Sequence, residues 1–175
     1  MRVFLDFEAS SLSDDSYPIE VAWVFEDGRD RSFLLRPLPA WTDWNDGAER
    51  IHGISRARLD AEGTEVATVA HEMVEALSGH ALFASAPSWD GKWLSVLLRG
   101  AGLPRHALRL SKSDDAFVEA ARDIAGDRTT DADLTALVAD IIAKTTPPTP
   151  AHRALADARL ELERLTAVVA AARAL

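Results

Sequence analysis

Short apolar runs divide the first part of the chain into three strands. They occupy residues 3–5, 19–25 and 31–35, with turn-forming residues at 26–30 between the second and the third. The first run continues into the alternation Asp6-Phe7-Glu8. Because side chains alternate between the two faces of a strand, Asp6 and Glu8 point the same way while Phe7 points into a core. We therefore expect an antiparallel three-stranded meander with a carboxylate pair at the end of its first strand.

Helical periodicity dominates the remainder of the chain. Apolar residues three or four positions apart predict helices over residues 66–77, 91–99, 115–125, 131–144 and 153–172, and a short run predicts a buried strand at 81–84. Thr64 is the expected N-cap of the first of these helices, and Asp90 stands where the second begins. A proline-rich loop over residues 145–150 precedes the last helix. Three strands followed by alternating helices and strands predict a mixed α/β fold, and the absence of repeats and long linkers predicts a single domain over residues 1–175.

The composition is typical of a globular protein without disulfides or a membrane-spanning helix. The chain is 47% hydrophobic and 27% charged, which is typical of a packed globular protein and excludes a largely disordered one. It contains no cysteine, so disulfides, thiolate metal sites and a catalytic thiol are excluded. No apolar run approaches the roughly 18 residues of a membrane-spanning helix, and Asp6 comes too early for a secretory signal. We expect a cytoplasmic protein without a membrane partner.

Net charge limits the partners. The formal charge is −9, and residues 1–50 contribute 11 acidic against 5 basic side chains. Such a chain repels a polyanion at long range, which argues against a protein that coats duplex nucleic acid. Divalent cations held by some of these acids would reverse the charge locally.

Five polar residues at the ends of expected elements form the candidate chemistry: Asp6, Glu8, Asp90, His152 and Asp157. Each has an ordinary structural explanation, as a strand-end charge, a helix N-cap, a first-turn acid or a surface histidine. Five positions along a helix turn a side chain by about 140°. His152 and Asp157 therefore converge more readily if His152 lies on the proline-rich loop and Asp157 on the last helix.

The motifs around these residues resemble the DEDDh 3′–5′ exonucleases of the ribonuclease H-like fold. Residues 5–12 resemble the first exonuclease motif with its Asp-x-Glu, residues 87–94 the second, and residues 152–158 the third with its His-x-Ala-x-x-Asp. Residues 51–55 and 17–22 also match segments of this group, which includes oligoribonuclease, ribonuclease T and polymerase proofreading subunits. The resemblance covers nearly the whole chain. One departure is Ala86, which stands where the second motif usually has asparagine and affects the expected substrate preference.

This resemblance implies a mechanism and a cofactor. The fold would be a ribonuclease H-like mixed sheet of five strands flanked by helices. Asp6, Glu8, Asp90 and Asp157 would hold two divalent cations, Mg²⁺ or Mn²⁺, which suit carboxylate ligands and stabilise both oxygens of an in-line displacement at phosphorus. His152 would act as general base, a role worth typically 10²–10⁴-fold in rate. The product would be a nucleoside 5′-monophosphate released from the 3′ end.

Further residues are expected beside the substrate. By the same resemblance these are Ala9, Ser10, Leu12, His52 and Trp89, although His52 can equally belong to a structural turn. Trp41 and Trp44 could stack on bases or pack over the edge of the sheet.

The expected substrate is a short single strand. The cations expected near it are few, namely Arg56, Arg58, Lys92 and Arg153, which predicts a footprint of a few nucleotides, a shallow salt dependence and poor binding of duplex. We expect RNA to be slightly favoured over DNA. Relatives such as oligoribonuclease work as homodimers, and the alanine-rich last helix offers a face for a second copy.

Two alternatives belong to other classes of function. The first is a catalytically silent nucleic-acid-binding or protein-docking module on the same fold, which the presence of all five core residues disfavours. The second is a ribonuclease H-like endonuclease, which the spacing of His152 and Asp157 disfavours.

Overall fold

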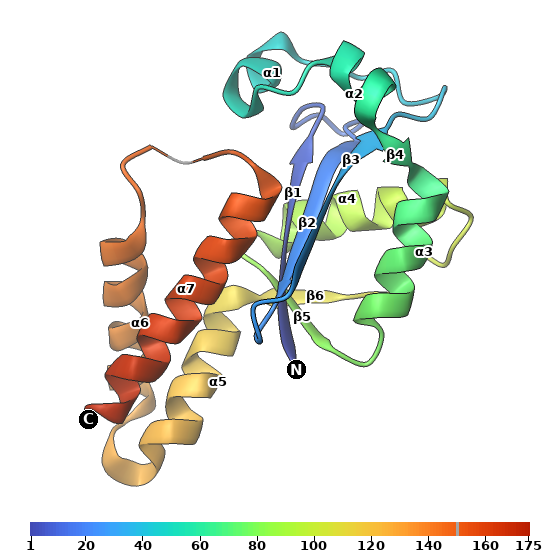
Figure 1. Ribbon diagram of the computed structural model, residues 1–175. Helices are drawn as coiled ribbons and strands as arrows, with labels where there is room; N and C mark the ends of the chain where they lie inside the picture. The colour runs from blue at the N-terminus through green and yellow to red at the C-terminus, as the bar shows by residue number, and fades with distance from the viewer. Residues whose placement is uncertain (150) are drawn as a thin grey trace.

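Strand β1 (Arg2–Ala9) lies near the middle of a six-stranded sheet with the order β4-β3-β2-β1-β5-β6 (Figure 1). The other strands are β2 (Pro18–Phe25), β3 (Asp30–Arg36), β4 (Thr64–Glu65), β5 (Ala81–Ala84) and β6 (Leu110–Lys112). β2 runs antiparallel to β1 and β3, whereas β5 is parallel to β1 and to β6. This computed structural model, which describes residues 1–149 and 151–175, confirms the predicted meander and the mixed α/β fold.

Helices cover both faces of the sheet. They are α1 (Asp46–His52), α2 (Arg56–Glu62), α3 (Val66–Leu77), α4 (Pro87–Gly100), α5 (Ser113–Ala125), α6 (Asp131–Thr145) and α7 (Ala154–Arg173), with a 3₁₀ turn at Gly126–Arg128. Figure 1 shows α5, α6 and α7 on one side of β1 and β2, and α3 and α4 on the other. Among the described residues, no helix is both long and apolar enough to cross a membrane.

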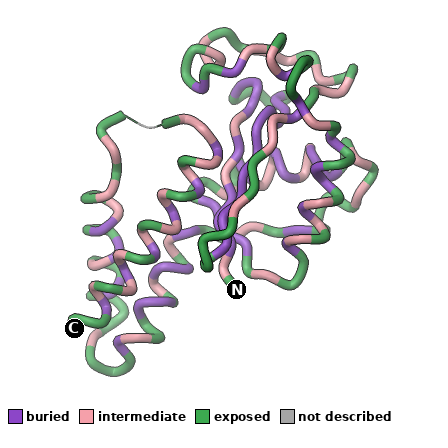
Figure 2. The backbone as a smooth tube through the Cα atoms, in the orientation of Figure 1, coloured by how far each residue is buried: buried purple, intermediate pink, exposed green. Residues whose placement is uncertain are grey.

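The alternation along β1 separates two cores and places the acids. Leu5 and Phe7 belong to a core formed with α3 and α4, whereas Phe4 packs with α5, α6 and α7. Figure 2 shows that the central strands are largely buried between these helices. Asp6 and Glu8 share the face of Phe4, because side chains two residues apart point the same way. The carboxylates therefore face α7, which packs against both β1 and β2. The predicted inward direction of Phe7 is confirmed.

One predicted helix start and one predicted N-cap were wrong, whereas α3 spans residues 66–77 as predicted. α4 begins at Pro87, four residues earlier than its apolar pattern indicates, because proline is favourable at the first helical position. Asp90 is consequently in the first turn of α4 and neither opens nor caps it. Thr64 is not a cap, since it lies in β4, and Glu65 precedes α3 without a capping hydrogen bond.

The sheet has six strands where five were predicted. β4 and β6 are two and three residues long, too short for a recognisable alternation. Between residues 46 and 62 the chain forms α1 and α2, each seven residues long, which the apolar pattern did not indicate. Asn45 caps α1, and Gly53 ends it with a left-handed φ of 69°. The predicted proline-rich loop ends at Pro150, which lies outside the described residues.

Candidate active site

Three carboxylates converge where β1 meets the start of α7. Asp6 and Glu8 come from β1, and Asp157 comes from the first turn of α7. One carboxylate oxygen of each lies within 4.8 Å of the other two, and all three residues are half-buried. The predicted convergence of these three acids is therefore present in the structure.

Burial and mutual repulsion make these carboxylates reluctant to ionise together. Burial raises the pKa of Glu8 to about 8, and the charges of Asp157 and Glu20 add to the rise while Arg153 opposes it. The pKa of Asp6 is well above its ordinary value because of burial, and next because of Asp90 and Glu8. Burial also raises the pKa of Asp157. A bound cation would relieve this repulsion.

Asp90 lies near the three carboxylates but is not one of the residues whose oxygens lie within 4.8 Å of one another. It is only 3% exposed, and burial raises its pKa to about 7 against backbone hydrogen bonds with Ala86 and Phe7. Its charge is the largest coulombic contribution to the raised pKa of Asp6. Ala86 supplies its carbonyl oxygen, which accepts the Asp90 N–H at 3.0 Å, and no polar side chain. The departure from asparagine thus leaves only a backbone contact at this position.

The donor set of the three carboxylates fits a hard divalent cation. Each donor is a carboxylate oxygen, and Mg²⁺ and Mn²⁺ prefer oxygen ligands over nitrogen and sulfur. Three acids within 4.8 Å that repel one another are costly without a positive partner. The residues therefore suit the cofactor that the sequence resemblance implies.

The start of α7 is anchored to the sheet by Glu20. This β2 residue faces Glu8 in the strand register and is 2% exposed. Its carboxylate accepts hydrogen bonds from Arg153 Nε at 3.0 Å, Arg153 Nη2 at 2.6 Å and the Ala154 N–H at 3.0 Å. Arg153 is the N-cap residue of α7, and its own N–H donates to Asp157 Oδ2 at 3.3 Å. Glu20 therefore fixes the segment between His152 and Asp157.

His152 precedes this anchor in an unusual backbone conformation. Its φ is 48°, which makes it the one residue other than glycine with a positive φ in the described part of the chain. A left-handed backbone costs about 1 kcal/mol or more for such a residue, so the surrounding contacts must hold it. As predicted, His152 lies outside α7 while Asp157 is inside it.

A pocket of about 280 Å³ opens beside the carboxylates. Five of the predicted site residues line it, namely Glu8, Ala9, Leu12, His52 and His152. Its remaining walls are Ser11, Ala48, Ile51 and Trp93. Leu12 and Ile51 are 69% and 59% exposed, so two apolar side chains of the pocket lining are accessible to solvent. The pocket is therefore mostly apolar, with one carboxylate and two imidazoles in its lining.

His52, in the lining of this pocket, is held in one tautomer by a hydrogen bond from the backbone. Its Nδ1 accepts the Ile54 N–H at 3.0 Å, so in the neutral ring the proton is on Nε2. Burial lowers the pKa of the ring, which favours this neutral form. The buried Nε2 has no partner among the described residues. The structural turn expected as an alternative is present, because His52 ends α1.

Two residues predicted to bind substrate lie outside the pocket lining. Ser10 is buried, and its hydroxyl donates to Asp43 Oδ2 at 2.7 Å. Asp43 also accepts hydroxyl hydrogen bonds from Ser11 and Ser13, so it holds the loop between β1 and β2 together. Trp89 is 37% exposed and stacks on Trp93, with ring centroids 5.6 Å apart.

The two tryptophans considered for base stacking, Trp41 and Trp44, serve packing. Trp41 stacks on Tyr17 at 5.2 Å, and Trp44 Nε1 donates to Glu49 at 2.9 Å. Both join the small core around Ile54, which supports the packing alternative.

The sequence analysis missed several residues that shape this site. Glu20 appeared only as part of a matching segment, although an acid inside an otherwise apolar run of eight residues is itself a signal of a buried polar contact. Asp43 and Ile51 gave no such signal, because isolated polar or apolar residues in an irregular stretch are common.

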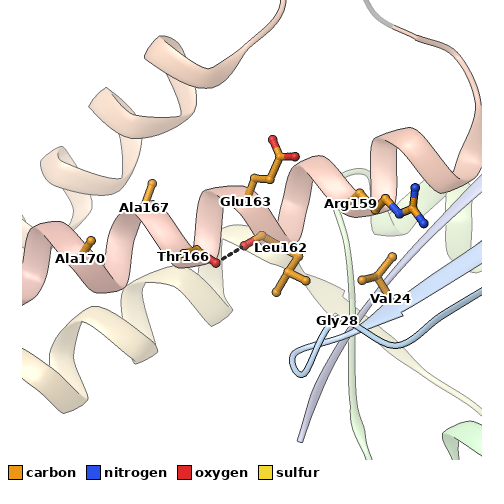
Figure 3. Close-up of a pocket in the computed structure, with 8 residues that line it drawn as sticks. All are labelled: Val24, Gly28, Arg159, Leu162, Glu163, Thr166, Ala167 and Ala170. Carbon is orange, nitrogen blue, oxygen red and sulfur yellow. Dashed lines mark hydrogen bonds between the residues drawn. The ribbon is translucent and has the colours of Figure 1, made fainter.

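A larger cavity lies away from this site. It measures about 530 Å³ and is formed by α7 together with Val24 and Gly28 of the β2–β3 hairpin (Figure 3). Its lining is mostly apolar, with Leu162, Ala167 and Ala170 from α7. None of the predicted site residues is in this lining, and the homodimer suggested for the last helix stays a prediction.

Solved structures similar to this chain include several of exonuclease I. A zinc-bound E. coli exonuclease I–single-stranded DNA complex matches with a TM-score of 0.69 at 18% identity over 97% of this chain and 40% of that one. The E. coli enzyme in complex with a dA16 oligonucleotide matches with a TM-score of 0.69 at 16% identity, over 99% and 41%. A product-bound exonuclease I structure matches with a TM-score of 0.65 at 16% identity, over 95% and 42%. No protein-family model matches the chain, and no curated protein matches it either.

These likenesses show the fold. The chain has the mixed α/β, ribonuclease H-like fold of exonuclease I, as the sequence resemblance predicted. It spans about 40% of the length of the structures it matches.

Proposed function

We propose that this protein is a metal-dependent 3′–5′ exonuclease of the DEDDh type that degrades single-stranded nucleic acid. One observation carries the proposal: Asp6, Glu8 and Asp157 converge within 4.8 Å, and His152 and Glu8 line one adjacent pocket. Individually these residues have structural explanations, but their convergence from β1, α7 and the preceding loop does not follow from packing. The likeness to exonuclease I, whose structures include complexes with single-stranded DNA, supports the same reading.

Four acidic residues would together bind two divalent cations. Asp6, Glu8 and Asp157 would hold the first ion, and Asp90 would serve the second. Mg²⁺ or Mn²⁺ bound there would supply charge stabilisation to the attacking and leaving oxygens of the phosphodiester. The protein contributes carboxylates that repel one another, and a bound cation would relieve this repulsion.

His152 accepts the proton of the attacking water. It lies in the pocket wall with Glu8, on a segment that Glu20 anchors through Arg153 and Ala154. A neutral imidazole is suited to this role near neutral pH. The left-handed backbone at His152 is the kind of local strain that persists where a side chain must be held in one direction.

The pocket receives the terminal nucleotide. Its apolar walls, including Leu12, Ile51 and Trp93, suit a nucleobase, which presents two apolar faces. Hydrolysis of the last phosphodiester then releases a nucleoside 5′-monophosphate.

A degradation assay tests this function. Single-stranded RNA and DNA oligonucleotides labelled at the 5′ end should yield ladders that shorten from the 3′ end in Mg²⁺ or Mn²⁺. Asp157→Asn should abolish the ladder, whereas the matched control Asp140→Asn, on the exposed side of α6, should not. Uniform internal cutting would identify an endonuclease, and binding without degradation in either metal would identify a silent module.

A further inference from the structure

Basic residues are concentrated in one part of this acidic chain. Residues 91–113 contain five lysines and arginines and no acidic residue, although the whole chain carries a net charge of −9. The segment runs from α4 through a connecting loop to β6 and the first residue of α5. This segment is positively charged, whereas the protein as a whole is negatively charged and repels polyanions.

The cations first expected to contact the substrate are occupied by the protein itself. Arg153 pairs with Glu20 at 2.6 Å, and Arg58 pairs with Glu62 at 2.9 Å. Two others donate to backbone and hydroxyl oxygens: Lys92 to Ser13 and Ser16, and Arg56 to Trp41 and Thr42. None of the four is a free phosphate ligand, so the binding of a polyanion requires other cations.

Two arginines of the basic segment line a separate pocket. Arg105 and Arg109, both exposed, border a cavity of about 460 Å³ between α4 and the strand β6. Neither forms an ion pair with any residue of the described chain, and Arg105 Nε donates to His106 Nε2 at 2.8 Å. The rest of the lining comprises Gly91, Leu94, Ser95, His106, Leu108 and Leu110. We call this cavity the basic pocket.

The basic pocket adjoins the candidate active site along α4. Gly91, in its lining, directly follows Asp90, and Ser95 lies about 7.5 Å from Asp90 along the helix axis, at 1.5 Å per residue. Trp89 is exposed at the same end of α4, with Lys92 Nζ 5.3 Å from its ring centroid. An extended strand that leaves the carboxylates can therefore reach Arg105 and Arg109 within a few nucleotides.

We propose that the basic pocket binds backbone phosphates of the substrate strand a few nucleotides upstream of its 3′ end. The proposal rests on the exonuclease function above and extends it with a second contact region. Arginine guanidinium groups match phosphate oxygens in geometry and stay charged at any working pH. Two such groups without carboxylate partners can accept phosphates without breaking an existing ion pair.

Kinetics with substrates of two lengths test this proposal. The variant Arg105→Gln/Arg109→Gln removes both charges, and the control Arg29→Gln/Arg31→Gln removes two exposed charges from the far end of the β2–β3 hairpin. For a single-stranded dodecamer, we expect the first variant to raise KM about tenfold and to reduce the log–log salt slope by about 1.4, at about 0.7 per phosphate contact. For a trinucleotide, which ends before the basic pocket, KM should change less than about twofold. The control should match the wild type with both substrates.

The outcomes separate this proposal from the function it rests on. If wild type and control degrade both substrates and the arginine variant keeps the wild-type KM and salt slope, the basic pocket does not bind substrate. An equal rise of KM for both lengths would also overturn the proposal, because it would place the arginines at the terminal nucleotide or in the fold. If the wild type degrades neither substrate, the exonuclease function fails and the proposal fails with it.

Discussion

The carboxylate cluster predicts that one conservative substitution stabilises the metal-free protein. Burial and neighbouring acids raise the pKa of Glu8 from 4.5 to about 8. Between these values the folded protein keeps a proton that the unfolded chain releases, so stability falls as pH rises from about 5 to about 8. Glu8→Gln removes this group and keeps its size. The stabilisation should therefore be absent at low pH and present at high pH.

The magnitude follows from the size of the pKa change. A rise of about 3.5 pH units corresponds, at about 1.4 kcal/mol per unit, to about 5 kcal/mol of destabilisation above pH 8. Asp157 and Glu20 contribute to the same repulsion, and partial exposure of Glu8 weakens it. For the single substitution we therefore expect about 2 to 3 kcal/mol of stabilisation at about pH 9 and less than about 0.5 kcal/mol at about pH 5.

Urea denaturation in EDTA at both pH values measures these free energies. Glu26→Gln, which changes an exposed acid at the other end of the sheet, is the matched control and should change stability by less than about 0.5 kcal/mol. Adding Mn²⁺ should stabilise the wild type and not Glu8→Gln, because only the intact set binds the ion. Equal stabilisation by Glu8→Gln at both pH values, or destabilisation at high pH, would refute the electrostatic account of this cluster.

Three further predictions concern catalysis. His152→Ala should keep the fold and the metal affinity but lose about 10²–10⁴-fold in turnover, with partial recovery at high pH; an unchanged rate between about pH 6 and 9 would exclude it as the base. Glu20→Gln weakens the anchor of Arg153 and should lower kcat about tenfold with little change in KM, whereas a purely structural role would lower the melting temperature and leave kcat intact. Blunt duplex DNA should be degraded much more slowly than single strands of the same length, and a preference for duplex would contradict the proposed pocket.

Much of the site could be predicted because its residues belong to short motifs with fixed positions on regular elements. The alternation Asp6-Phe7-Glu8 sets the direction of both acids as soon as β1 forms, and a histidine after a proline-rich loop predicts a position outside the following helix. Phe7 in the core and His152 outside α7 confirm both inferences. Such local geometry requires no knowledge of the tertiary structure.

The parts that could not be predicted depend on contacts between distant segments. Glu20 meets Arg153 across 133 positions of sequence, and Asp43 meets Ser11 across 32. No periodicity encodes such pairs. The start of α4 was wrong for a different reason: its first turn, from Pro87 to Asp90, lies outside its apolar pattern, so hydrophobic periodicity alone set the boundary too late.

The central claim is that Asp6, Glu8 and Asp157 form a metal-dependent exonuclease centre. Chromatography of the products from a single-stranded oligonucleotide, incubated with Mg²⁺ or with EDTA, tests it most directly. We predict nucleoside 5′-monophosphates from the first time point in Mg²⁺, none in EDTA, and none from Asp6→Asn in either condition. Equal product release in EDTA, or products other than 5′-mononucleotides, would contradict the claim.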